Sequence, residues 1–168
     1  AESWYQKGSV LERTGRGEEA LQAYDSAVEV DPSFAKAWQS KGHLLYSMNR
    51  YTDALECYDR AVKIDPFDEH VWYERGLALQ NLGRLEEAVG SYDNATEIDP
   101  SSAEIWYTRG TALDGLGRYD EAVESYDRAL AIDPRDVKSW NRKGDDFYKL
   151  GQHRQAVECY DKFIELSS

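Results

Sequence analysis

Residues 69–102 read EHVWYERGLALQNLGRLEEAVGSYDNATEIDPSS, and variants of this stretch make up the whole chain. Its tryptophan belongs to a series with a constant step of 34 residues, and such a set of equivalent positions is termed a column below. The clearest columns are Trp4, Trp38, Trp72, Trp106 and Trp140; Gly8, Gly42, Gly76, Gly110 and Gly144; Ala20, Ala54, Ala88, Ala122 and Ala156; Tyr24, Tyr58, Tyr92, Tyr126 and Tyr160; and Pro32, Pro66, Pro100 and Pro134. A fixed period in several columns indicates tandem repeats. We therefore predict one domain, residues 1–168, with repeats 1–34, 35–68, 69–102, 103–136 and 137–168.

Each repeat is predicted to fold as two amphipathic helices. Apolar side chains recur at three- and four-residue intervals on both sides of Gly83, as they do along one face of a helix. Gly83 marks the turn, and Asp99-Pro100 ends the second helix because proline lacks an amide hydrogen and disfavours helical geometry in the preceding residue. We expect helices over roughly residues 2–14 and 18–30 of the first repeat, recurring at the same step, and no strand.

The starts of the later repeats carry helix-capping residues. Asp68, Ser102 and Asp136 stand where a first helix is expected to begin. Side-chain oxygens of Asp and Ser accept hydrogen bonds from the free amides at a helix N-terminus. These three residues are therefore predicted N-caps.

Composition excludes several classes of protein. The chain has 168 residues, 32 acidic and 20 basic, for a formal net charge of −12. This balance opposes binding to nucleic acid or to anionic membranes. No apolar run approaches the roughly 18 residues of a membrane span. Two cysteines are too few for a disulfide framework, which favours the cytoplasm. Because the chain starts at Ala1 without an initiator methionine or signal segment, we expect it to be an excised piece.

The columns resemble the tetratricopeptide repeat, a 34-residue helix-turn-helix. In the first repeat the matching residues are Trp4, Gly8, Leu11, Ala20, Tyr24, Ala27 and Pro32. The resemblance implies an all-α fold, a right-handed superhelical solenoid of helix-turn-helix repeats whose first helices line a concave groove. It also implies that small residues such as Gly42 let paired helices approach closely, while Trp38 and Tyr58 fill the remaining space. Grooves of this kind bind extended or helical peptides of other proteins.

One column departs from the family pattern. Where the family often has leucine before the glycine, this chain has Lys7, Lys41, Arg75, Arg109 and Lys143. Their apolar stems can pack while their charges reach water or a nearby acid. The column of Asp25, Asp59, Asp93, Asp127 and Asp161 is the expected partner.

The variable residues of the first helices are the candidate contacts for a peptide, because the invariant ones are occupied in packing. The candidates are Tyr5, Gln39, His43, Tyr46, Tyr73, Tyr107, Lys138, Asn141 and Arg142. Tyrosine supplies rigid amphipathic contact area and is enriched at binding hot spots. The alternative is that these rings only cover neighbouring helices.

The last repeat concentrates basic residues on its first helix. Lys138 and Arg142 match the last pair of the carboxylate clamp with which chaperone-binding members of the family grip a peptide C-terminus. Tyr73, Leu77 and Thr108 occupy the other clamp positions, so a full clamp is not expected. The alternative is a solvated basic face that offsets nearby acids. Those acids are Asp145, Asp146 and Asp161.

No catalytic motif or cofactor-binding motif is present, and we expect neither an enzyme nor a cofactor. His43 and His70 lie on the first helices of adjacent repeats, with Glu74 one turn beyond His70. A metal site of these three residues is chemically sensible, but no metal is predicted because unlinked histidines are more often ordinary polar residues. Cys57 and Cys159 occupy one column three repeats apart, beyond disulfide reach, so both are expected to be reduced.

The second helix of the last repeat is predicted to expose an apolar edge of Val157, Tyr160 and Ile164. Phe163 stands where other repeats have alanine, and its bulk would obstruct an ordinary next repeat. This edge suggests self-association through the C-terminal repeat, or contact with a removed segment, unless Phe163 folds over its own repeat. Two functions follow as hypotheses: a non-catalytic protein–protein interaction module that binds a peptide, or an architectural segment of a larger protein that docks through its ends or convex face.

Overall fold

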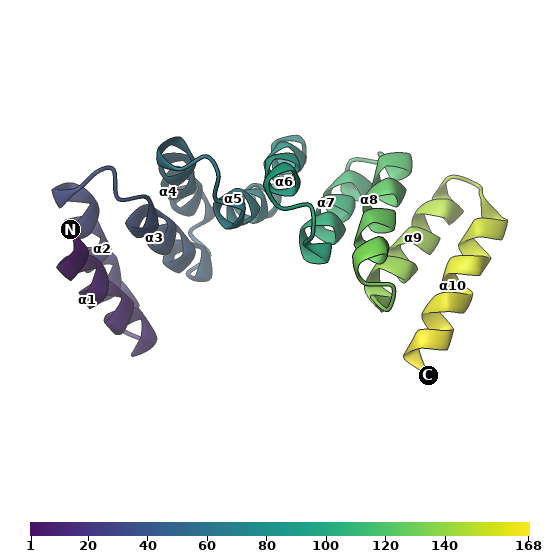
Figure 1. Ribbon diagram of the computed structural model, residues 1–168, viewed down its shortest axis with the longest axis horizontal. Helices are drawn as coiled ribbons and strands as arrows, with labels where there is room; N and C mark the ends of the chain where they lie inside the picture. The colour runs from purple at the N-terminus through teal and green to yellow at the C-terminus, as the bar shows by residue number, and fades with distance from the viewer. The chain divides into compact units, whose positions relative to one another are not determined.

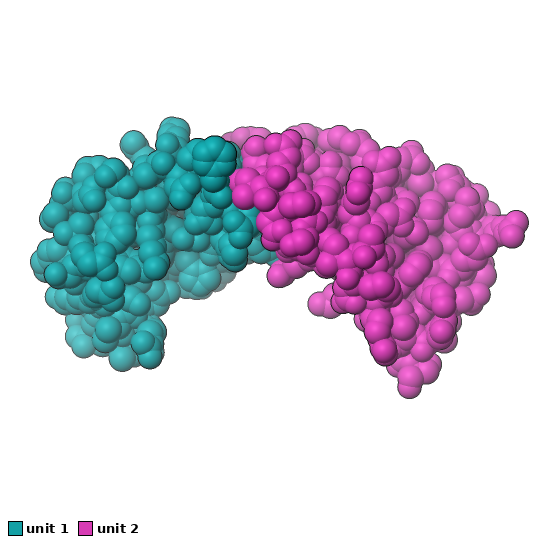
Figure 2. Space-filling view, in the orientation of Figure 1, with its two compact units in different colours: residues 1–83 teal, residues 84–168 magenta.

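A computed structural model describes all residues 1–168 as helices joined by short turns, without strands. The chain divides into two compact units, residues 1–83 and 84–168 (Figure 2). Unit 1 contains α1 (Glu2–Arg13), α2 (Gly17–Val30), α3 (Ala35–Ser47), α4 (Tyr51–Ile64) and α5 (Glu69–Asn81). Unit 2 contains α6 (Leu85–Ile98), α7 (Ala103–Gly115), α8 (Tyr119–Ile132), α9 (Val137–Lys149) and α10 (His153–Ser167).

These bounds confirm the predicted all-α fold, a solenoid of helix-turn-helix repeats, with each helix starting and ending within two residues of its expected place. In unit 1 the hairpins α1–α2 and α3–α4 pack in succession, with α2 against α3 and α4 against α5 (Figure 1). In unit 2, α6 packs on α7, followed by the hairpins α7–α8 and α9–α10. The single-domain organisation stays a prediction.

Helix termini follow the sequence signals. Asp68 accepts hydrogen bonds from the amides of His70 and Val71, and Asp136 caps α9 in the same way. Ser102 accepts one from the amide of Ile105, so all three predicted N-caps are confirmed. The turns inside the hairpins use a left-handed residue, which is glycine in four of the five repeats because glycine adopts positive φ without strain. Asn49 takes this role in the second repeat with φ 60°.

The glycine and tyrosine columns form one packing unit in the hairpins α1–α2, α3–α4, α7–α8 and α9–α10. A Cβ atom at Gly42 would lie 2.8 Å from the ring of Tyr58, and one at Gly110 would lie 2.6 Å from the ring of Tyr126. Both rings are at most 1% exposed. The glycine therefore makes room for a fully buried tyrosine, as predicted from the resemblance.

The tryptophans lie at the links between repeats rather than deep in the core. The indole nitrogen of Trp38 donates to the carbonyl oxygen of Pro32 at 3.0 Å, and Trp72, Trp106 and Trp140 make the same bond to the preceding proline. Each ring is partly exposed. Trp38 packs on the buried cluster of Ala27, Val28 and Ala37, while its indole nitrogen bonds the link carbonyl and Lys41 lies over its face.

That basic side chain belongs to the Lys/Arg column, which was predicted to pair with the Asp column. The structure shows these ion pairs, and we call the series the Asp–base ladder. The four bases of repeats 2 to 5 each pair with the Asp that stands 16 positions earlier, on the second helix of the preceding repeat, whereas Lys7 has no preceding repeat. The pairs are Lys41–Asp25 at 2.6 Å, Arg75–Asp59 at 2.7 Å, Arg109–Asp93 at 2.6 Å and Lys143–Asp127 at 2.5 Å. Each cation also lies 4.9–5.9 Å from the centre of the tryptophan ring of its own repeat, within cation–π range.

Candidate functional site

A pocket of about 280 Å³ opens between α3 and α5 in unit 1, with α4 at its base. We name it the Glu74 pocket; its lining residues are Gln39, His43, Tyr46, Tyr58, His70, Tyr73, Glu74 and Leu77. Four of these, Gln39, His43, Tyr46 and Tyr73, are predicted contact residues. The first helices supply seven of the eight because side chains of adjacent repeats face one another across the gap.

Glu74 organises the polar side of the Glu74 pocket. The side-chain amide nitrogen of Gln39 donates to Glu74 Oε2 at 3.2 Å. The Nδ1 atom of His43 lies 2.8 Å from Glu74 Oε1. The Glu74 side chain is 20% exposed and His43 is 60% exposed, so the contact reaches the surface. One carboxylate thus fixes two side chains of the preceding repeat.

Tyrosines form the apolar side of the Glu74 pocket. Tyr58 is fully buried, which raises the pKa of its hydroxyl, and the nearby Glu74 charge raises it further. Tyr46 accepts a hydrogen bond from the amide nitrogen of Asn81 at 2.8 Å and packs edge-on against Tyr51. Burial also raises the pKa of Tyr46. Both phenols therefore remain neutral at physiological pH.

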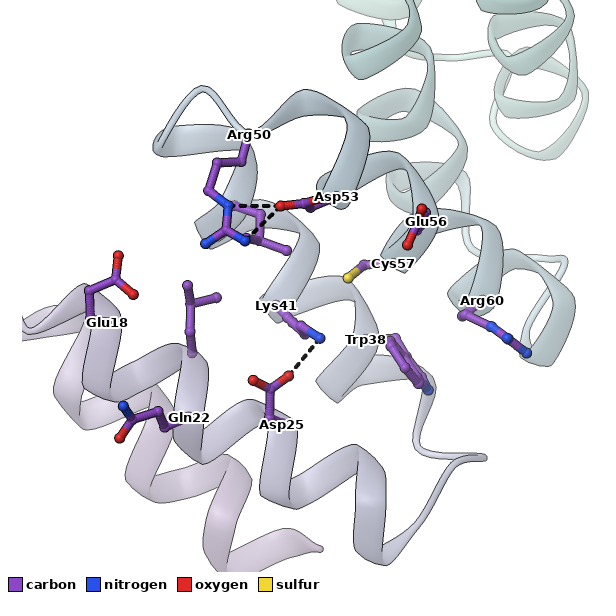
Figure 3. Close-up of a pocket in the computed structure, with 12 residues that line it drawn as sticks. Glu18, Gln22, Asp25, Trp38, Lys41, Arg50, Asp53, Glu56, Cys57 and Arg60 are labelled. Carbon is purple, nitrogen blue, oxygen red and sulfur yellow. Dashed lines mark hydrogen bonds and ion pairs between the residues drawn. The ribbon is translucent and has the colours of Figure 1, made fainter.

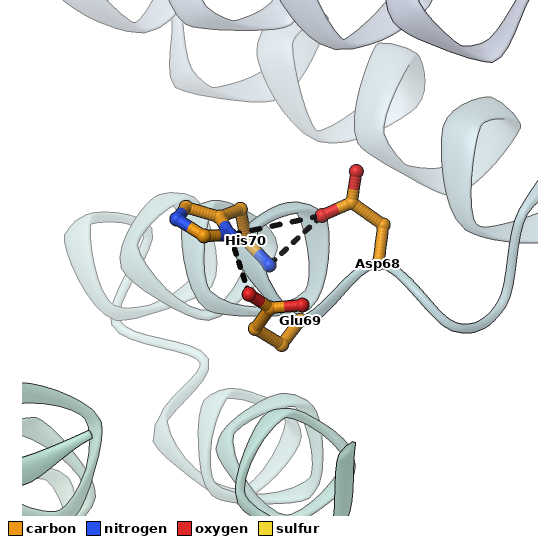
Figure 4. Close-up of side chains that lie close together, drawn as sticks. All are labelled: Asp68, Glu69 and His70. Carbon is orange, nitrogen blue, oxygen red and sulfur yellow. Dashed lines mark hydrogen bonds and ion pairs between the residues drawn. The ribbon is translucent and has the colours of Figure 1, made fainter. Parts of the chain in front are cut away.

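His70 lines the same pocket but does not join His43 at Glu74. Its Nδ1 atom lies 2.8 Å from Glu69 and 4.0 Å from Asp68 (Figure 4). His43, His70 and Glu74 thus line one pocket, but the Nδ1 atom of His70 faces its sequence neighbours at the start of α5 rather than Glu74. Asp68, Glu69 and His70 bring three possible ligand atoms within 4.8 Å. Asp68 already caps α5, so this cluster has a structural role.

Tyr5 lies on α1, outside the Glu74 pocket. Its ring centre is 5.3 Å from that of Phe34 and 5.9 Å from that of Tyr24, and Lys36 lies over its face. It joins the cluster of Ala27, Val28 and Ala37 with Trp38. Tyr5 therefore covers neighbouring helices.

In unit 2 the corresponding face of α7 and α9 carries charges that are paired with one another. Lys149 forms an ion pair with Asp114 and lies 3.3 Å from Asp146, while Arg142 lies 3.9 Å from Asp114. Asp146 is 1% exposed, and its Oδ2 atom has no hydrogen-bond partner. Burial, together with the adjacent Asp114, raises the pKa of Asp146 to about 7. Lys149 and Arg142 are partly exposed and offset these acids, while Asp146 itself is buried in the joint between repeats.

Two of the other candidates of unit 2 line a second opening, and Asn141 lies outside it. Tyr107 and Lys138 line a pocket of about 410 Å³ with Thr108, Glu104 and Asp136. The Tyr107 ring lies 5.9 Å from that of Tyr126. Asn141 is partly exposed on α9. Sequence reasoning missed Asp114, Asp146 and Lys149 as a cluster, although Asp146 breaks an otherwise apolar column of Val10, Leu44, Ala78 and Ala112.

A further pocket of about 480 Å³ lies on the second-helix side of unit 1 (Figure 3). Four of its charged lining residues form the ion pairs Lys41–Asp25 and Arg50–Asp53. Cys57 contributes a thiol whose pKa is raised to about 11 by burial. A thiol held neutral is a poor nucleophile. Cys57 and Cys159 are both free, as expected.

The edge of α10 is exposed as predicted. Val157 is 57% and Ile164 60% exposed, whereas their counterparts in other repeats are at most 8% exposed. Tyr160 is half-buried and donates to Asp145 at 2.8 Å. Phe163 is also half-buried. None of the helices combines the length and the apolar character that crossing a bilayer requires.

Comparison with known proteins agrees with the repeat architecture. Family models described as tetratricopeptide repeat or TPR repeat match residues 1–44, 42–83, 73–137 and 137–168, which together cover the chain. None of the curated proteins compared with the chain matches it.

Several solved structures share the fold. A crystal structure of MamA is 22% identical, with a TM-score of 0.92 over 95% of this chain and 94% of that one. A structure of MamA from Desulfovibrio magneticus RS-1, from residue 41 to the end, is 22% identical. Its TM-score is 0.90, over 99% of this chain and 94% of that one. YrrB, described as a TPR protein with an unusual peptide-binding site, is 23% identical, with a TM-score of 0.89 over 97% and 84%. With its columns, its hairpins and these matches, the chain belongs to the tetratricopeptide repeat family.

Proposed function

We propose that this protein is a non-catalytic interaction module that binds a peptide segment of another protein along the first-helix face of its repeats. The observation that carries the proposal is the Glu74 pocket, where variable side chains stay accessible while the family's packing columns are buried. Family membership supports a role in protein interaction, and YrrB provides a relative in fold that has a peptide-binding site.

The chemistry of this face suits binding rather than catalysis. Aromatic rings with a few fixed polar groups are typical of recognition surfaces. The acids and bases that approach one another are paired in static contacts, and the buried thiols are held neutral. We infer that partners are proteins or peptides, and that the protein uses no cofactor.

A peptide-library selection on the full chain tests this function. Selected peptides should bind the Tyr73→Ala variant at least about tenfold more weakly, and Tyr107→Ala should weaken those that extend over unit 2. Phe67→Ala is the matched control, because Phe67 is an aromatic residue of unit 1 that is 79% exposed and lies outside the pocket. Equal binding by all three variants would place the site elsewhere.

A second, architectural function is favoured by α10. Val157 and Ile164 are exposed at positions that are buried in the other repeats. Within unit 2, α10 packs only on α9. We propose that this edge packs on another molecule, which can be a second copy of this chain. Sedimentation over a concentration series should show association that Ile164→Glu removes. A parent that stays monomeric excludes self-association.

A further inference from the structure

The Glu74 pocket has the composition of a cation site. Its eight lining residues include one carboxylate and no lysine or arginine. The remaining surface is made mostly of tyrosine rings and Leu77. A cation from outside would therefore meet one unlike charge and no like charge among the residues that line the pocket.

Hydrogen-bond directions leave acceptors facing the pocket. A carboxylate can only accept, so both Gln39 and His43 must donate to Glu74. Neutral His43, with its proton on Nδ1, then presents Nε2 as an acceptor. His70 has the same arrangement, because its Nδ1 faces Glu69. Each Glu74 oxygen also keeps a second lone pair.

Aromatic faces complete the site. Tyr46, Tyr58 and Tyr73 come from three successive helices and line one cavity. Tyrosine rings attract cations through their faces, and the planar guanidinium of arginine also stacks on them. Arginine has five N–H donors, which suits acceptors spread over Glu74, His43 and His70 better than the compact ammonium of lysine.

Size and long-range charge point the same way. The volume of about 280 Å³ is below the roughly 300–1,000 Å³ typical of drug-sized ligands, so it suits one side chain. The net charge of −12 attracts basic partners at a distance.

We propose that the Glu74 pocket receives an arginine side chain of the peptide partner, with Glu74 as its counter-ion. This inference rests on the proposed function and adds the chemistry of the partner. In the complex the guanidinium donates to Glu74 and to imidazole Nε2 while its plane lies against a tyrosine ring.

A double-mutant cycle on selected peptides tests the pairing. Peptides that bind the full chain in buffer with EDTA should contain a common arginine. Replacing that arginine by leucine should weaken binding at least about tenfold, and replacement by lysine should cost less but remain measurable. On the Glu74→Gln variant, the arginine-to-leucine change should have a much smaller effect.

The controls separate this inference from the proposed function. Glu29→Gln removes the same charge from an exposed site on α2 and should leave the arginine dependence intact. Selected peptides that lack arginine, or whose dependence on arginine survives in Glu74→Gln, overturn the inference. If binding of those peptides is still weakened by Tyr73→Ala, the proposed peptide-binding function stands. Binding that appears only without EDTA assigns the pocket to a metal ion and also overturns it. A library that yields no binder overturns both proposals.

Discussion

Glu74 in unit 1 and Asp114 in unit 2 lie on equivalent first helices, α5 and α7, yet their charges are balanced differently. Glu74 accepts from the side-chain amide of Gln39 and lies 2.8 Å from Nδ1 of His43. Asp114 is held by Lys149 and Arg142, with the second acid Asp146 beside it. Asp114 is therefore paired with two cations of its own unit, whereas no lysine or arginine lines the Glu74 pocket. The proposed arginine of the partner would supply the cation that the Glu74 pocket lacks.

What the two units share is the packing beneath these faces, and breaking it should have the largest effect. Gly42→Ala and Gly110→Ala each place a methyl group against a buried tyrosine ring, 2.8 and 2.6 Å away. Each should lower the free energy of unfolding by about 1–3 kcal/mol, measured by urea denaturation. Similar losses would show that both units depend on the same hairpin packing.

Gly90→Ala is the matched control for this pair. Gly90 lies inside α6, and a Cβ atom there meets nothing within 4 Å. Alanine is the better helix former, so this variant should gain about 0.5–1 kcal/mol. Destabilisation by Gly90→Ala of the same size as by Gly42→Ala would contradict the steric explanation.

The buried acid of unit 2 should give the next largest effect, as a dependence on pH. The folded-state pKa of Asp146, about 7, lies above the value near 3.9 of an unfolded carboxyl. The folded chain therefore holds a proton that the unfolded chain has lost, and its stability falls as the pH rises from about 4 to about 7. The loss between pH 5 and 8 should be on the order of 2 kcal/mol.

Asp146→Ala should remove this loss, because Ala112 fills the equivalent position of the preceding repeat. Urea denaturation at pH 5 and 8 should show a flatter pH dependence than the parent and a more stable variant at pH 8. Glu124→Ala, which removes an exposed acid on α8, controls for net charge. An unchanged slope in Asp146→Ala would mean that Asp146 titrates normally.

The sequence predicts the structural features that are set by the 34-residue period. Helices, caps and the Asp–base ladder follow because each is set by residues that recur in one register, so a single repeat supplies the reason for all. The ladder even shows its detail: arginine occurs where the residue 16 positions later is Ser91 or Ser125, and lysine where it is alanine or cysteine. Arg109 donates to Ser125 at 2.6 Å, which explains one of these pairings.

The site depends on what differs between repeats, and there the sequence is weaker. The sequence left open whether His70 meets His43, and the structure pairs its Nδ1 atom with Glu69, a neighbour on its own helix turn. The sequence marked Asp146 only as an acid near the basic face, and the structure buries it. Its apolar column contained the signal, because positions equivalent to Leu44 and Ala78 pack between repeats. Choosing among the rotamers that build the Glu74 pocket required the structure.

The Asp–base ladder offers a test with a smaller expected effect, in which the Arg109–Ser125 pair of unit 2 is replaced by the Lys–Cys combination of unit 1. Ser125→Cys leaves one arm of Arg109 without its oxygen acceptor and should cost about 1 kcal/mol. Adding Arg109→Lys reproduces the Lys41–Cys57 combination of unit 1 and should recover part of that loss. Urea denaturation of the two single variants and the double variant measures the coupling. Strictly additive losses would show that the arginine–serine pairing is incidental.

The smallest expected effect comes from the starts of the second helices. Arg50 pairs with Asp53 and Arg118 with Glu121 at 2.6 Å, but the last repeat has Gln152 and Gln155 at these positions. Gln152→Arg combined with Gln155→Glu should restore the ion pair at the start of α10. Because Gln155 is exposed and Gln152 is only half-buried, the gain should stay below about 0.5 kcal/mol and vanish at high salt. Thermal melts at low and high salt measure it. A gain that persists in high salt would contradict an electrostatic origin, because salt screens both the ion pair and the interaction of a first-turn glutamate with the helix dipole.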